Sequence, residues 1–192
     1  MSQIKHAKLD QIPAGHKCEH DGYEYFRRKF VPFGSAQHTH VCIYEIPPGK
    51  SAYPYHFHYK TEETFYIIGG EGLLRTPDGE KNVSAGELIF FPAGESGAHK
   101  LTNISESDNL VYIDFDSTHD LDVAVYPDSD KIGIWGMGVN QLAVLISVTR
   151  GCQPPWLSCS QPLNWVYTSY LLPFKRKRLV RRLTVTGAPE RF

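Results

Sequence analysis

The segment PYHFHYKTEETFYIIGG, residues 54–70, carries the pattern that decides the fold and the chemistry of this chain. In a β-strand, the side chains of residues i and i+2 point to the same side, so His56 and His58 project together. On the strand expected next along the chain, Glu63 shares its side with Phe65. A hairpin of these two strands would bring two imidazoles and one carboxylate to a common point inside a barrel.

Two histidines and a carboxylate that face one cavity form a metal site with open coordination positions. Imidazole and carboxylate ligands favour Fe, Mn, Ni, Zn or Cu over Mg or Ca. Glu62 would replace Glu63 only after a one-residue slip of the strand, which would turn Phe65 and Ile67 outward. A second HxH pair lies at residues 38–40, and we expect it to be a partly exposed strand pair.

Residues 86–103, GELIFFPAGESGAHKLTN, supply a further histidine. The segment begins with a glycine turn and continues with a short apolar run typical of a buried strand. A Pro-Gly turn follows, and His99 comes directly after it.

Short apolar runs between residues 36 and 125 alternate with Gly, Pro and Asp turns at intervals of about 8–12 residues, a pattern typical of an all-β sandwich or barrel. No stretch of this region keeps a helical period for three turns. The predicted strands are His40–Ile46, Thr64–Ile68, Gly72–Arg75, Glu87–Phe91, Lys100–Ile104 and Asn109–Phe115.

The two segments resemble the two conserved motifs of the cupin superfamily. The first motif matches Gly49, His56, His58, Glu63 and Gly70, and the second matches Gly86, Pro92, Gly94, His99 and Asn103. The resemblance implies a double-stranded β-helix, or jelly roll. It also implies one divalent transition metal (Fe, Mn, Ni, Zn or Cu) bound by His56, His58, Glu63 and His99. The loop between Gly94 and His99 is longer than in the motif.

The charge of the chain is divided unevenly. Residues 1–141 contain 12 Lys/Arg and 20 Asp/Glu, a net charge of −8, whereas residues 142–192 contain 8 Lys/Arg and one acidic residue, a net charge of +7. With the motifs, this division predicts an N-terminal arm (1–30), a cupin barrel (31–125), a post-barrel segment (126–141) and a basic tail (142–192). The composition of the tail is typical of a disordered end or of a segment translated out of frame, and both interpretations stay open.

The partners and the compartment follow from composition. No apolar run reaches the roughly 18–20 residues needed to cross a bilayer, and no apolar signal segment begins the chain. Four cysteines without a CxxC pair favour reduced thiols and a cytoplasmic location. The acidic barrel gives no reason to expect nucleic acid or membrane as a partner. We expect a small-molecule ligand and a homodimer formed by pairing of sheets or by exchange of Tyr23–Phe30.

These observations predict a metal-binding cupin that acts on or binds a small polar molecule. If the protein is an enzyme, the expected class is a metal-dependent dioxygenase, isomerase or lyase. The alternative is a non-catalytic cupin that serves as a sensor or a store. No pattern marks a catalytic acid or base outside the metal ligands, and no phosphate-binding loop for a nucleotide cofactor is present. The candidate pocket residues are Tyr44, Tyr66, Phe90 and Tyr112.

Overall fold

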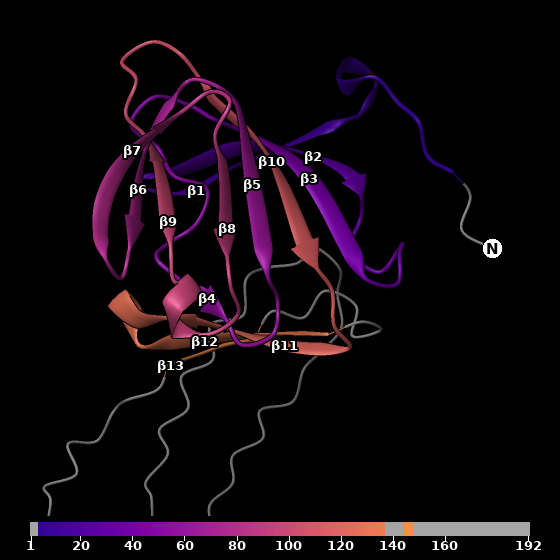
Figure 1. Cartoon of the computed structure of the whole chain (residues 1–192), viewed down its shortest axis with the longest axis vertical. Coiled ribbons are helices and arrows are strands. Elements are labelled where there is room, and N and C mark those ends of the chain that lie inside the picture. The colour runs from indigo at the N-terminus through magenta and orange to yellow at the C-terminus, as the bar shows by residue number, and fades with distance from the viewer. Residues whose placement is uncertain (1–3, 137–143, 148–192) are drawn as a thin grey trace, which may run out of the picture.

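The computed structural model describes residues 4–136 and the backbone of residues 144–147 (Figure 1). In these residues the regular elements are β-strands, apart from the three short 3-10 turns η1 (Leu9–Gln11), η2 (Glu95–Gly97) and η3 (Pro127–Ser129). The all-β prediction is confirmed. No helix in the described part of the chain is long and apolar enough to cross a membrane. Most of the predicted basic tail, residues 148–192, lies outside the described residues.

The strands form three antiparallel sheets. The six-stranded sheet has the order β1 (Ala14–His20), β2 (Tyr23–Val31), β3 (Thr39–Ile46), β10 (Leu110–Ser117), β5 (Glu63–Gly69), β8 (Leu88–Phe91). The four-stranded sheet has the order β13 (Val144–Ser147), β12 (Lys131–Gly136), β11 (Leu121–Tyr126), β4 (Phe57–His58). The three-stranded sheet has the order β7 (Gly79–Ser84), β6 (Glu71–Thr76), β9 (Lys100–Asn103).

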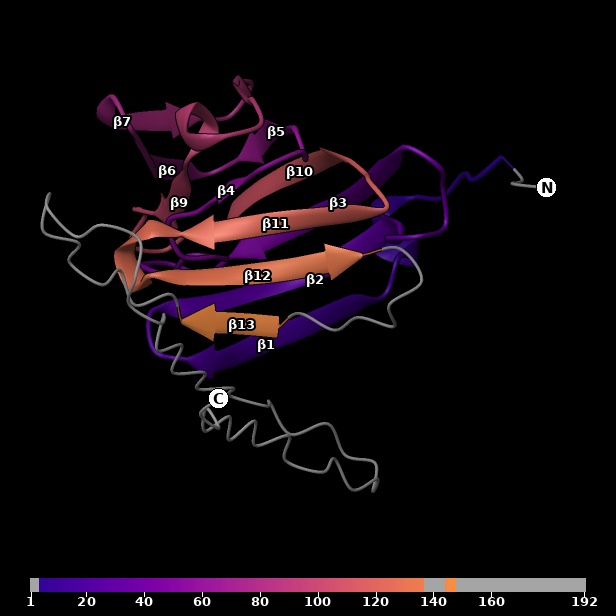
Figure 2. The same cartoon turned by 90° about the horizontal axis from the view of Figure 1, so that it is seen from below.

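The four-stranded sheet lies across one side of the molecule, below β5, β8, β9 and β10 in the view of Figure 1. Figure 2, seen from below, has β11 and β12 in front of β2 and β3 of the six-stranded sheet. The two sheets therefore face each other, as in a jelly roll.

The six predicted strands correspond to β3, β5, β6, β8, β9 and β10. The sequence pattern did not predict β7, whose outward positions are polar and whose one buried residue is Val83. β1 and β2 extend the six-stranded sheet, because β2 pairs with β3. β12 and β13 extend the four-stranded sheet beyond residue 125.

The inward and outward positions of β5 alternate as its sequence predicts. Glu63, Phe65 and Ile67 are buried, and Tyr66 and Ile68 are exposed. Successive side chains of a β-strand point to opposite faces of the sheet. The inward face of β5 therefore contributes two apolar side chains and one carboxylate to the interior.

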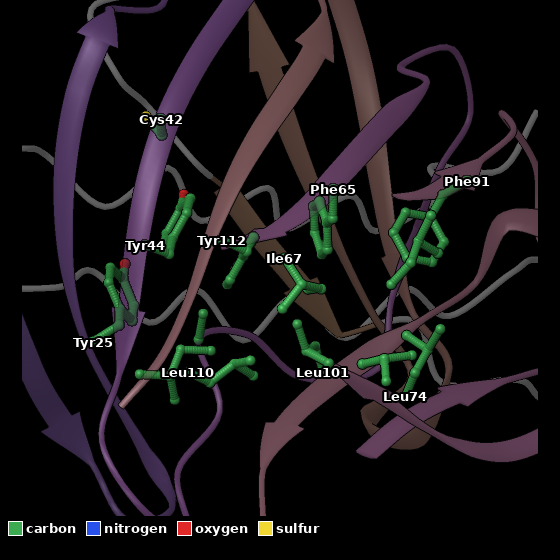
Figure 3. Close-up of a cluster of buried hydrophobic side chains, with 14 residues drawn as sticks. Tyr25, Cys42, Tyr44, Phe65, Ile67, Leu74, Phe91, Leu101, Leu110 and Tyr112 are labelled. Carbon is green, nitrogen blue, oxygen red and sulfur yellow. The ribbon is translucent and has the colours of Figure 1, made fainter. Parts of the chain in front are cut away.

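The interior holds one main apolar cluster, most of whose members come from the six-stranded and three-stranded sheets (Figure 3). Its labelled members include Tyr44, Phe65, Ile67 and Tyr112. The rings of Tyr44 and Tyr112 stack at a centroid distance of 5.2 Å. This cluster stabilises the sheet against which the polar groups described below are placed.

The register of β10 between β3 and β5 arranges the inward side chains in rows that cross the three strands. One row is apolar and aromatic, and two rows contain acidic groups. The rows are Tyr44–Tyr112–Ile67, Cys42–Asp114–Phe65 and His40–Asp116–Glu63.

Gly70 and Gly49 offer a test of the packing at the end of β5. Both have a positive φ, 83° and 71°, but an added Cβ at Gly70 would lie 2.5 Å from the backbone oxygen of Asn109, and at Gly49 it would meet open space. We expect Gly49→Ala to lower the free energy of unfolding by about 1–2 kcal/mol through the left-handed backbone alone. Gly70→Ala adds a backbone clash, so its loss exceeds about 3 kcal/mol.

Urea unfolding of the two variants measures the difference. Equal losses at both positions would contradict the close approach of the chain at Gly70.

Candidate metal centre

The structure brings the four predicted ligands together from separate strands. His56 precedes β4 and His58 ends it, Glu63 begins β5, and His99 precedes β9. The backbone groups of His56 and His99 bond to each other in both directions, with N···O distances of 3.1 and 2.9 Å. His56, Glu63 and His99 are 7%, 8% and 2% exposed, so the site is largely withdrawn from water.

The side-chain atoms of this group converge on the Glu63 carboxylate. Its Oε2 lies 3.2 Å from Nε2 of His99, and its Oε1 lies 3.8 Å from Nε2 of His58. One ligand atom from each of His56, His58 and Glu63 lies within 4.8 Å of the others. These three residues could hold a metal ion, and His99 is placed beside them through its contact with Glu63.

Each of the three imidazoles is fixed through its Nδ1 atom. Nδ1 of His56 donates to the carbonyl oxygen of Pro54 at 2.8 Å, and Nδ1 of His99 donates to that of Gly97 at 2.9 Å. Nδ1 of His58 lies 2.8 Å from a carboxylate oxygen, described below. A histidine that donates through Nδ1 presents a lone pair on Nε2, which is the usual arrangement of a metal-binding histidine.

Asp122 on β11 is a functional residue that the sequence reasoning missed. Its Oδ2 accepts the hydrogen bond from Nδ1 of His58, and its Oδ1 accepts one from the backbone N–H of Lys60 at 2.9 Å. The buried Asp122 therefore orients His58 and holds the connection that leaves β4. No local pattern could have identified it, because it lies 64 residues after His58.

The prediction of a hairpin between the His56–His58 strand and the Glu63 strand is wrong. β4 pairs with β11 in the four-stranded sheet, whereas β5 pairs with β8 and β10 in the six-stranded sheet. The short connection of residues 59–62 thus crosses from one sheet to the other. The imidazoles and the carboxylate meet because the sheets face each other, not because their strands are neighbours.

Burial controls the charges at the centre. It raises the pKa of Glu63 to about 8, against the opposing effect of His58 and with a further rise from the nearby Asp116 and Asp122 carboxylates. Burial lowers the pKa of His99 to about 4 and that of His56 well below its ordinary value. Burial also opposes the charged form of His58, but the hydrogen bond to Asp122 and the nearby carboxylate charges together outweigh it, and the pKa of His58 is raised.

A second polar group lies beside the centre, in the acidic rows of the sheet. Nδ1 of His40 lies 2.9 Å from Oδ2 of Asp116, and its Nε2 lies 3.2 Å from Sγ of Cys42. Burial opposes the charge on His40, but the bonds to Asp116 and Cys42 outweigh it and raise its pKa to about 9. His40 is thus an imidazolium at neutral pH, which donates through both nitrogens. It is half-buried on β3 and His38 before it is exposed, so the expected partial exposure of this pair is confirmed.

Asp114 and Asp116 each have one buried carboxylate oxygen, Oδ1, without a hydrogen-bond partner in the described residues. One oxygen from each of these residues and one from Glu63 lie within 4.8 Å of one another. Burial, followed by the charges of Asp116 and Glu63, raises the pKa of Asp114 well above its ordinary range. Burial therefore favours the protonated form of Asp114.

The predicted pocket residues divide into two groups. Tyr44 and Tyr112 point inward, each 2% exposed, in the main apolar cluster. Tyr66 and Phe90 point outward, 38% and 59% exposed, so their prediction as pocket residues is wrong. An aromatic residue on a strand indicates an apolar environment but does not reveal which face of the sheet carries it.

Three further aromatic rings contact the imidazoles. Phe91 stacks on His99 at a centroid distance of 3.7 Å, and Tyr126 stacks on His56 at 5.6 Å. The ring of Phe65 meets His99 edge-on at 5.3 Å. These contacts fix the planes of the two rings and add to the loss of water around them.

The raised pKa of Glu63 predicts a pH dependence in the metal-free protein. The folded protein holds the Glu63 proton up to about pH 8, whereas the unfolded chain releases it near the ordinary pKa of 4.5. The stabilising effect of that proton is complete below pH 4.5 and is lost as the pH rises to about 8. We expect Glu63→Gln to remove this decline, because glutamine has no proton to release.

Denaturant titrations of the EDTA-treated protein at pH 5, 6.5 and 8 measure this effect, with Glu95→Gln as an exposed control. A wild-type decline no steeper than that of Glu63→Gln over this range would contradict the burial of the carboxylate.

Comparison with known proteins finds a family model that matches part of this chain. Residues 42–116 match the Cupin_2 family model, which describes a cupin domain. No curated protein matches the sequence.

Several solved structures have a fold similar to that of this chain. A protein from Acidithiobacillus ferrooxidans suggested to be a sugar phosphate isomerase is 22% identical, with a TM-score of 0.64 over 76% of this chain and 91% of that chain. A cupin sugar phosphate isomerase from Silicibacter pomeroyi is 19% identical, with a TM-score of 0.61 over 69% and 87% of the two chains. The polyketide cyclase RemF from Streptomyces resistomycificus is 24% identical, with a TM-score of 0.52 over 61% and 81%. The fold is the cupin jelly roll, and the chain contains a cupin domain of the Cupin_2 family.

Proposed function

We propose that the protein binds one divalent transition metal through His56, His58, Glu63 and His99, and acts on or binds a small polar molecule there. The observation that carries this proposal is the anchoring of all three imidazoles through Nδ1, with Nε2 of His58 and of His99 directed at the Glu63 carboxylate. Such outer hydrogen bonds are typical of metal-binding histidines.

The donor set fits the metals that the sequence suggests. Three neutral imidazoles and a carboxylate suit Fe, Mn, Ni, Zn or Cu, and they leave coordination positions free. A metal bound there would act as a Lewis acid on an oxygen of the small molecule. The cation would also replace the proton on Glu63, since the carboxylate must be ionised to bind it.

The acidic groups beside the centre support a ligand that is rich in hydroxyl or amine groups. A buried acceptor without a partner costs about 1–3 kcal/mol, and the Oδ1 atoms of Asp114 and Asp116 are two of them. The hydrogen bond from Nδ1 of His40 to Oδ2 of Asp116 holds the Asp116 carboxylate in position. Donor groups of a small ligand would satisfy the two free oxygens.

The fold is compatible with more than one class of reaction. The structural neighbours include proteins named as isomerases, a cyclase and a protein suggested to be an oxalate decarboxylase, so dioxygenase, isomerase and lyase activities all stay open. The free thiols of Cys18 and Cys42 support the cytoplasmic location that we propose, and the acidic barrel supports a small-molecule partner over nucleic acid.

Metal analysis tests the proposal directly. We expect the purified full chain to contain about one transition metal ion, and we expect the double variant His56→Ala, His58→Ala to lose at least about nine tenths of it. Saturating metal at about 1,000 times its Kd stabilises a folded protein by about 4 kcal/mol, so the variant should also lose the metal-dependent rise in Tm. His38→Ala, at an exposed position, serves as the control.

A chain without bound metal, whose Tm does not respond to added Fe, Mn, Ni, Zn or Cu, would refute the metal centre. A thermal-shift screen with small sugars, acids and keto-acids then identifies ligands of the loaded protein. Turnover of a ligand that binds distinguishes an enzyme from a sensor or storage module.

We also propose that the protein is a homodimer formed by pairing of sheets. The outer face of β5, β8 and β10 carries five exposed apolar side chains: Tyr66, Ile68, Leu88, Phe90 and Phe115. β8 is an edge strand of its sheet in the described structure. β2 is paired with β1 and β3 of its own chain, which favours sheet pairing over exchange of Tyr23–Phe30.

Light scattering tests the assembly. We expect a dimer mass for the wild type and a monomer mass for Leu88→Lys combined with Phe90→Lys, because two charges would have to lose their water on association. Asn82→Lys, at an exposed position of β7, should stay dimeric. A wild-type monomer at high protein concentration would contradict the proposal.

A further inference from the structure

Arg27 on β2 is a half-buried cation that belongs to a group of phenols. Its Nη1 donates to the phenol oxygen of Tyr44 at 3.4 Å and to that of Tyr53 at 3.2 Å. The oxygen of Tyr53 also lies 3.1 Å from that of Tyr44 and 3.3 Å from that of Tyr25. The guanidinium therefore bonds to two hydroxyl groups, and the hydroxyl of Tyr53 connects them to that of Tyr25.

Arg27 has no carboxylate partner among the described residues. Arg28, the next residue, points to the other side of β2 and pairs with Glu45. Burial raises the pKa of both Tyr44 and Tyr53 well above the usual phenol value, so both are neutral at physiological pH. The positive charge of Arg27 is not neutralised there, and a charge partly removed from water without a counter-charge is costly.

The remaining donors of Arg27 are open to a ligand. No described residue accepts a hydrogen bond from its Nε or Nη2, and neither atom is sealed from solvent. Lys29, two residues later, is opposite Cys42 in the strand register, as Arg27 is opposite Tyr44. The two cations therefore follow each other along the same side of β2.

This group adjoins the candidate metal centre. The ring of Tyr53, which bonds to Arg27, lies 5.9 Å from the ring of His56 between centroids. One tyrosine thus separates the guanidinium from the nearest proposed metal ligand. A small molecule held at the metal could extend to Arg27.

We propose that Arg27, with the hydroxyl groups of Tyr44 and Tyr53, binds an oxyanion, a phosphate or a carboxylate, of the small molecule whose other end lies at the metal centre. Binding of an oxyanion at Arg27 does not depend on the proposed function. The placement of the other end of the molecule at the metal centre does. A guanidinium recognises oxyanions through a planar fork of N–H donors. The two phenol–phenol bonds use two of the three O–H groups, so one O–H of the group remains to donate to the same anion. Lys29 adds a second positive charge nearby.

A purely structural role for Arg27 makes a different prediction. If its function were to cover the Tyr44 ring, 6.0 Å from its Cζ atom, its replacement would lower stability without affecting anions. Anion binding therefore separates the two roles.

The test measures binding of inorganic phosphate and of acetate to the purified full chain by titration calorimetry at constant ionic strength. We expect saturable binding of at least one of them, and the anion that binds identifies the source of the oxyanion. Arg27→Gln should weaken it at least about tenfold, the change expected when one charge-assisted hydrogen bond is lost. Arg28→Gln removes the same charge from the opposite side of β2 and should change binding less than twofold.

Tyr53→Phe removes one hydroxyl and keeps the ring, so it reports on the site even if Arg27→Gln fails to fold, and we expect it to weaken the anion severalfold. The absence of binding by both anions, or equal binding by wild type, Tyr53→Phe and a folded Arg27→Gln, would overturn the proposal. The result is independent of the metal analysis: Arg27-dependent anion binding supports the anion site whether or not the chain binds a metal ion.

Discussion

The register of β10 between β3 and β5 determines which side chains meet inside the barrel. It places Asp116 between His40 and Glu63, and Tyr112 between Tyr44 and Ile67. A shift by one residue would exchange every inward side chain of β10 for an outward one. The apolar cluster, the acidic rows and the carboxylate of the candidate centre therefore depend on one pairing, which the aromatic contacts of Tyr112 help to stabilise.

With this pairing, the inward side chains change from apolar to acidic along the three strands. The Tyr44–Tyr112–Ile67 row is apolar, whereas the next two rows hold Asp114 and Asp116. Because these groups lie in little water, their charges depend on their neighbours: burial raises the pKa of Asp114 well above its ordinary range, and the His40 imidazolium donates a hydrogen bond to Asp116. The protein thus presents apolar, acidic and basic groups within one small space, which is the condition for orienting a small polar molecule.

The sequence predicted the part of the site that local pattern encodes. Strand alternation predicted that His56 and His58 share a side, and the resemblance to the cupin motifs implied that Glu63 and His99 join them. The sequence could not predict Asp122, Asp114 or Arg27. Their partners lie far along the chain, and nothing in an acidic or basic residue on a strand reveals the residue opposite. The hairpin prediction failed for the same reason, since the partner of β4 is β11.

The hydrogen bond between His58 and Asp122 joins residues 64 positions apart, and this separation has a kinetic meaning. Contacts between distant residues form after the chain has closed a long loop, so folds rich in them assemble slowly. During synthesis, the orientation of His58 cannot be completed before β11 has left the ribosome and paired with β4. The imidazoles and Glu63 are present long before that moment, but their geometry is completed late, after most of the six-stranded sheet has been made.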